Sequence, residues 1–94
     1  MFLKKLFSKS KNHIEKGSTY GVLKGDYRGE IFVFFKQEDC ILYFVSLPKM
    51  ELRKVDMCKF DIGLKDKILD FINIIPQDVY KVVEAHGKNL ITAK

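Results

Sequence analysis

The residues best suited to chemistry in this sequence lie in one short segment, Lys24-Gly25-Asp26-Tyr27-Arg28-Gly29. An exposed aromatic ring beside basic side chains is the arrangement that stacks on the bases and contacts the phosphates of single-stranded nucleic acid. Glycine and aspartate favour tight turns, so the segment is expected to join two strands. With two lysines of the N-terminal segment, the candidate nucleic-acid-binding residues are Lys4, Lys5, Lys24, Tyr27 and Arg28.

The histidines and cysteines form no motif for metal binding or nucleophilic catalysis. His13 and His86 are 73 positions apart and Cys40 and Cys58 are 18 apart, whereas a structural zinc site uses closely spaced ligand pairs. The cysteines are expected to be small buried apolar residues with free thiols. Most of the acidic residues lie at polar positions of the predicted strands, helices and loops, where they are expected to be exposed to solvent and not paired in a pocket. We therefore expect no enzymatic activity, no cofactor and no metal.

Length and composition favour a single globular domain. The chain has 94 residues, of which 47% are hydrophobic, and this is enough for one core and too little for two. No uncharged apolar run approaches the roughly 20 residues that a membrane-spanning helix needs.

The net charge of +5 comes from the N-terminal part of the chain. Residues 1–28 hold seven basic and two acidic residues, while residues 29–94 hold ten of each. A basic segment is a cue for nucleic acid, anionic lipid or an acidic protein surface. Fifteen of the 17 basic residues are lysine, which indicates an AT-rich source and disfavours base-specific reading, where arginine is preferred.

The N-terminal segment predicts a short amphipathic helix over Met1–Lys11. Phe2, Leu3, Leu6 and Phe7 fall on one arc and the lysines on the other. So short a helix needs a surface to dock on: the body of the protein, a partner, or a membrane. We assign residues 1–18 to a basic amphipathic segment and linker, and residues 19–94 to a single α+β domain.

Four strands are predicted in the first half of this domain: Thr19–Lys24, Glu30–Lys36, Cys40–Leu47 and Met50–Asp56. The second and third are apolar on both faces, so both faces of the sheet should be covered. The fourth is more polar and predicts a sheet edge, with Arg53 and Lys54 exposed. Its apolar residues change phase after Leu52, which predicts a bulge or a bend there.

The last third of the sequence changes to helical spacing. Apolar residues from Leu64 to Ile75 predict one helix, with Phe71 in the core, and Pro76 opens a second that ends at Gly87. A terminal strand is considered at Leu90–Thr92. The predicted fold is thus α+β: a small curled antiparallel sheet followed by two C-terminal helices packed on one face.

The turn at Gly25–Gly29 resembles the centre of a KOW motif, the glycine-bounded turn of small SH3-like barrels. Tyr20–Lys24 fits the incoming strand and Ile31 the outgoing strand, whereas Phe32 and Val33 stand where the family has a further glycine. The resemblance covers about a dozen residues. It implies an SH3-like sheet that binds RNA, DNA or a polymerase.

Three functions follow as hypotheses. The first is a small non-catalytic accessory regulator, of phage-like or bacterial character, that binds a protein in the cytoplasm (the host cytoplasm if the source is viral). The second is a KOW-like module that binds nucleic acid without sequence specificity, and the third is a peripheral membrane adaptor anchored by the N-terminal helix. Convergence of Lys24, Arg28, Lys36 and Arg53 near an exposed Tyr20 or Tyr27 would favour nucleic acid. The candidate protein-binding residues are Phe2, Leu3, Leu6, Phe7, Arg53 and Lys54.

Overall fold

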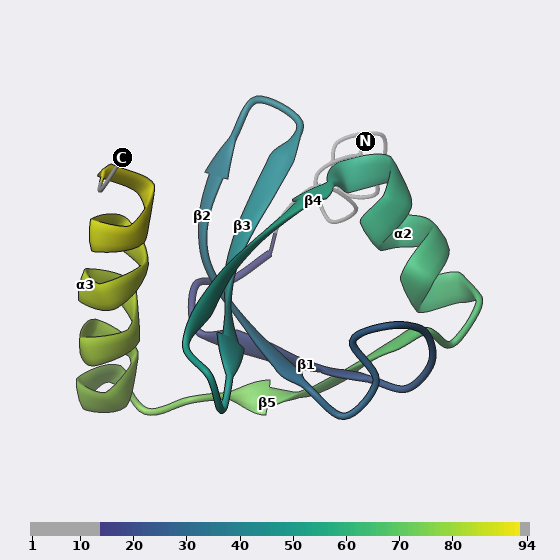
Figure 1. Ribbon diagram of the computed structural model, residues 1–94, viewed down its shortest axis with the longest axis horizontal. Coiled ribbons are helices and arrows are strands. Elements are labelled where there is room, and N and C mark those ends of the chain that lie inside the picture. The colour runs from purple at the N-terminus through teal and green to yellow at the C-terminus, as the bar shows by residue number, and fades with distance from the viewer. Residues whose placement is uncertain (1–13, 93–94) are drawn as a thin grey trace, which may run out of the picture.

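The computed structural model describes residues 14–92, which form an α+β fold with a five-stranded antiparallel sheet (Figure 1). The predicted fold class is therefore confirmed, while the helix expected over Met1–Lys11 lies outside the described residues. The elements are β1 (Ser18–Val22), β2 (Ile31–Glu38), β3 (Ile41–Leu47), β4 (Glu51–Asp56), α2 (Met57–Lys65), β5 (Leu69–Ile74) and α3 (Gln77–Thr92).

The strands lie in the order β4-β3-β2-β1-β5. β1 to β4 form a meander in which each strand pairs with the next, and α2 then carries the chain to the opposite edge, where β5 pairs with β1. The predicted position of β4 at an edge is confirmed. Among the described residues no helix is long and apolar enough to cross a bilayer.

The bulge predicted in β4 is wrong. β3 and β4 pair without interruption from Ile41–Asp56 to Ser46–Glu51, and the irregularities lie in the β2–β3 and β1–β5 pairs. Successive side chains of a strand point to opposite faces. Leu52 and Val55 differ by three positions and pack into the cores on opposite sides of the sheet. The change of apolar phase thus marks a regular strand that is covered on both sides.

Both faces of the sheet are covered, as predicted, but the two helices lie on opposite faces and not on one (Figure 1). On one face, Phe60 of α2 packs with Phe32 and Phe34. On the other face, α3 supplies Tyr80 and Val83. Each helix buries the alternate side chains of the same central strands, here Val33 and Phe35 for α3. A sheet that is apolar on both sides needs this arrangement, because a pair of helices on one face would leave the other in water.

The helix predicted from Leu64 to Ile75 is wrong, because α2 ends at Lys65 and β5 follows. Asp56 caps α2 by accepting a hydrogen bond from the Cys58 N–H at 2.8 Å, so the helix begins earlier than predicted. Lys67 then adopts a positive φ of 62° and turns the chain. The β5 segment is rich in isoleucine and suits a strand locally, and its pairing with β1 decides between the two structures.

The predicted helix after Pro76 is confirmed, but it runs through Gly87 to Thr92. The predicted end at Gly87 and the terminal strand at Leu90–Thr92 are therefore wrong. Gly87 is buried inside the helix because the ring of Phe35 occupies the space where a Cβ would lie. The prediction that Cys40 and Cys58 are buried is also wrong, since both are exposed.

The stability of the α3 face should fall in alkaline solution. The Tyr80 hydroxyl lies 3.4 Å from the Phe35 carbonyl oxygen and 3.1 Å from Glu84 Oε2. Burial, and then the hydrogen bond and charge of Glu84, raise the pKa of Tyr80 above its usual 10.0. A raised pKa in the folded state means that this stabilisation is complete below pH 10 and is lost as the pH rises toward the folded-state pKa, because the unfolded tyrosine ionises first. Between about pH 8 and about pH 10.5, the free energy of unfolding in urea should fall less for Tyr80→Phe than for the parent protein. Equal falls would contradict the assignment.

Candidate functional site

The turn predicted at Gly25–Gly29 is the loop between β1 and β2, and its backbone is closed on itself. The Arg28 N–H donates to the Gly25 carbonyl at 3.2 Å, and the Glu30 N–H donates to the Tyr27 carbonyl at 3.0 Å. Gly25 and Gly29 have φ of 95° and 94°, a region that favours glycine. This folding carries Tyr27 back over the sheet, where its ring lies 4.3 Å from the Arg53 guanidinium carbon.

Arg53 is held by acidic neighbours beneath that ring. Its Nη2 lies 2.8 Å from Glu51 Oε1 and 3.3 Å from Glu30 Oε1, and Ser46 Oγ donates a second hydrogen bond to Glu30. Burial opposes the charge of Arg53, but Glu51 and Glu30 outweigh it and raise the arginine pKa. The guanidinium thus holds the Tyr27 loop in place, and few of its N–H groups are left to bind a ligand. Lys54 lies next to it on β4 and is exposed.

An apolar pocket of about 280 Å³ opens beside this loop. The β1–β2 loop lines one side with Lys24, Asp26 and Tyr27, and α2 lines another with Lys59. The remaining apolar lining comes from the sheet and from the segment that enters β5: Val22, Phe32, Val55, Ile68 and Leu69.

Two lysine side chains line this pocket, one from the β1–β2 loop and one from α2. Both Lys24 and Lys59 are exposed, and Lys24 Nζ approaches the Asp66 carbonyl oxygen at 3.4 Å. Asp26 is the one acidic side chain of the lining, and no histidine or cysteine lines it. This pocket therefore has the groups for binding an apolar group that carries negative charge. Among residues 14–92 no cluster of three metal-ligating side chains occurs.

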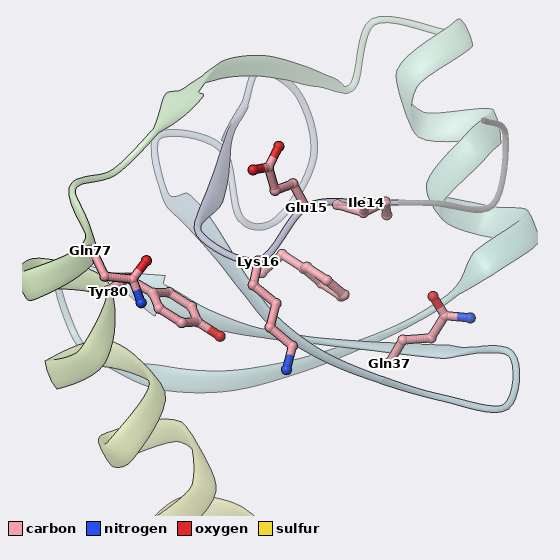
Figure 2. A pocket seen from close by; sticks show the side chains of 7 residues that line it. Ile14, Glu15, Lys16, Gln37, Gln77 and Tyr80 are labelled. Atoms are coloured by element: carbon pink, nitrogen blue, oxygen red, sulfur yellow. The ribbon is translucent and has the colours of Figure 1, made fainter. Parts of the chain in front are cut away.

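A second, wider pocket of about 600 Å³ lies where the described chain begins. Figure 2 shows Gln77 and Tyr80 of α3 at one end and Gln37 of β2 at the other, with Lys16 between them. Lys16 also borders a third pocket of about 410 Å³, together with Lys36 and Lys88. Both pockets are lined by residues of β2 and α3; the third is basic, whereas the second has Glu15 beside Lys16.

The structure brings together some of the residues predicted from the sequence. Lys24, Tyr27 and Arg28 share one loop, and Arg53 meets Tyr27. Lys36 lines a different pocket, and Tyr20 is buried against Phe60. The predicted convergence on an exposed aromatic residue is thus partial. The N-terminal candidates fall outside the described residues: Phe2, Leu3, Lys4, Lys5, Leu6 and Phe7.

Sequence reasoning missed the side of the pocket that α2 supplies. Lys59 lies in the first turn of α2, at a site where the sequence analysis expected no helix. Asp56 is the one local signal that could have found this helix, because aspartate is a preferred N-cap. Comparison of this chain with protein-family models, curated proteins and solved structures found no match.

Proposed function

We propose that this chain is a non-catalytic protein-binding module that recognises an acidic segment of a partner through the pocket between the β1–β2 loop and α2. The observation that carries the proposal is an apolar pocket with Lys24 on one side and Lys59 on another. In this proposal the protein is a cytoplasmic accessory regulator, and its partner presents an aliphatic or aromatic side chain flanked by aspartate or glutamate.

The pocket suits an anchor residue energetically. Burying one large apolar side chain contributes about 1.5–3 kcal/mol, and the two lysines add attraction and orientation for acidic neighbours. The Tyr27 wall is already held by Arg53 at 4.3 Å. A wall that is ordered before binding costs less conformational entropy on association, which favours affinity.

The strand order supports an SH3-like assignment for the sheet. A four-stranded meander whose fifth strand returns beside the first is an arrangement that suits a small curled antiparallel sheet. The loop that resembles a KOW turn connects the first two strands of this meander. We propose the SH3-like architecture on these grounds.

Nucleic-acid binding is the second candidate function, favoured by the shared loop of Lys24, Tyr27 and Arg28. It ranks lower because Arg53 covers one face of the Tyr27 ring and is itself paired with Glu30 and Glu51. A stacking platform needs a free ring face and unpaired cations. The membrane-adaptor hypothesis depends on residues that the structure does not describe.

The Lys59→Glu substitution should weaken recognition of the acidic partner. Peptides selected from a display library against the intact protein are expected to carry an apolar residue beside aspartate or glutamate. Reversing the charge at Lys59 should weaken binding of such a peptide at least about tenfold, measured by fluorescence anisotropy, because attraction becomes repulsion at the pocket. Glutamate in the first turn of α2 is compatible with the helix dipole, so the fold should be retained.

Lys81→Glu is the matched control, since Lys81 is an exposed lysine of α3 that does not line this pocket. If both variants weakened peptide binding equally, the effect would come from the net charge of the protein, and the assignment of the binding site to this pocket would be wrong. Sub-micromolar binding of a random single-stranded oligonucleotide at physiological salt, lost in Lys24→Glu, would place nucleic acid first.

A further inference from the structure

The two edges of the sheet differ in their protection against pairing with another strand. β4, at one edge, carries four charged residues among its six: Glu51, Arg53, Lys54 and Asp56. Charged side chains on an edge strand oppose its pairing with a further chain. β5, at the other edge, has Asp70 as its one charged residue. It pairs with β1 on one side, and within residues 14–92 no strand pairs with its other side.

The side chains of β5 are apolar and exposed on both faces of the strand. Phe71 lies 5.7 Å from the Tyr20 ring on the α2 face and is 49% exposed. Ile72 lies against Gly21 and is 50% exposed, and Ile74 is 46% exposed. In Figure 1 the strand runs along the lower rim of the molecule. An open edge with this composition is a template for strand addition.

The charge around β5 indicates what would bind there. Residues 68–80 contain no lysine or arginine, and Asp70 and Asp78 are their only charges. The acidic segment proposed for the Lys24–Lys59 pocket would therefore find no cation on β5. A neutral apolar strand fits this edge, and each copy of the chain carries one. Residues 29–94 have no net charge, so their net charge adds no repulsion between two copies.

We propose that β5 pairs antiparallel with β5 of a second copy, giving a two-fold symmetric dimer with a continuous sheet. An isologous contact of this kind needs only one self-complementary surface. Relative to β1, β5 has one extra residue between Phe71 and Ile74, so this edge is irregular there. In a register that pairs Ile72 with Ile72 of the second copy, each Asp70 lies opposite Ile74 of the other copy. No like charges then face each other directly, which removes the main penalty for cross-strand pairing.

The oligomeric state of the full chain tests this proposal. Sedimentation velocity from low to high micromolar concentration should show a monomer–dimer equilibrium. Ile72→Lys should raise the dimer dissociation constant at least about tenfold, since a lysine ammonium would be buried at the axis without a partner. Ile74→Lys is a second variant with the same expectation. Ile62→Lys is the matched control, because Ile62 is 54% exposed and belongs to α2 and not to β5.

Three results would overturn the proposal: a monomer at every concentration, a dimer that neither β5 variant weakens, or equal weakening by Ile62→Lys. A dimer that survives Ile72→Lys but is lost on deletion of residues 1–11 would assign self-association to the N-terminal segment instead. Circular dichroism of each variant shows whether the fold is retained. Sedimentation does not depend on peptide binding, so a result that contradicts the dimer does not contradict the function proposed for the Lys24–Lys59 pocket.

Discussion

Replacing Phe44 by alanine is expected to lower the free energy of unfolding by about 3–5 kcal/mol, the range for a fully buried aromatic side chain. Phe44 is 0% exposed at the centre of β3. Its ring stacks on Phe60 of α2 at 5.6 Å. The substitution therefore leaves a cavity between the sheet and the helix, and it removes ring contacts with Tyr20, Phe32, Phe34 and Phe60.

Phe71→Ala is the control for this prediction, because it deletes the same side chain at the edge of the sheet. Half of Phe71 is exposed and Tyr20 is its neighbouring ring, so its loss should cost less than about 2 kcal/mol. Urea unfolding followed by circular dichroism, at concentrations too low for self-association, gives both values. Equal costs for the two variants would contradict the assignment of the core to the β3–α2 contact.

The Gly87→Ala substitution is expected to destabilise the protein by about 1–3 kcal/mol, although alanine favours a helix over glycine by about 1 kcal/mol. A Cβ at Gly87 would lie 2.6 Å from Phe35 Cζ. Phe35 is 1% exposed, and three of its ring atoms would lie 2.6–2.9 Å from this Cβ, so the ring or the helix must shift. The steric conflict therefore outweighs the gain in helix propensity.

A double-mutant cycle tests this contact directly. In the Phe35→Leu background the added methyl group has room, so Gly87→Ala should become neutral or stabilising, with a coupling of at least about 1 kcal/mol. Gly63→Ala in α2 is the matched control. Its nearest neighbour is Leu69 Cδ1 at 3.2 Å, the end of a flexible side chain that can yield. Additive effects of the Gly87 and Phe35 substitutions would show that the ring does not limit the approach of α3.

The strands of the meander and the last helix could be predicted from local sequence because their signals are local. β2 and β3 are rich in β-branched and aromatic residues on either side of a short loop, and the residues directly opposite in the sheet are close in sequence. Pro76 and Asp78 mark the start of α3 in the same way. The apolar character of both strand faces also required two covering layers, which the helices provide.

The C-terminal elements could not be decided locally, because their structure depends on distant partners. The apolar spacing from Leu64 to Ile75 fits a helix as well as a strand, and β1, some 50 residues earlier, stabilises β5 by pairing with it. Gly87 normally favours a helix end, yet here its small size allows α3 to continue across Phe35. In both cases a non-local contact outweighs the local preference.

In the candidate site, too, some features follow from the local sequence and others only from the tertiary structure. The sequence by itself determined that Lys24, Tyr27 and Arg28 share a glycine-bounded turn, since adjacent residues must lie together. Only the tertiary structure decided that Arg53 forms ion pairs with Glu30 and Glu51 and lies over the Tyr27 ring. It also brought Lys59 to the pocket that Lys24 lines. These two lysines, about 35 positions apart, line one pocket because the strands pair into a sheet and α2 crosses between the edges of that sheet. The periodicity of apolar residues predicts helices and strands, but it does not predict how they are connected in space.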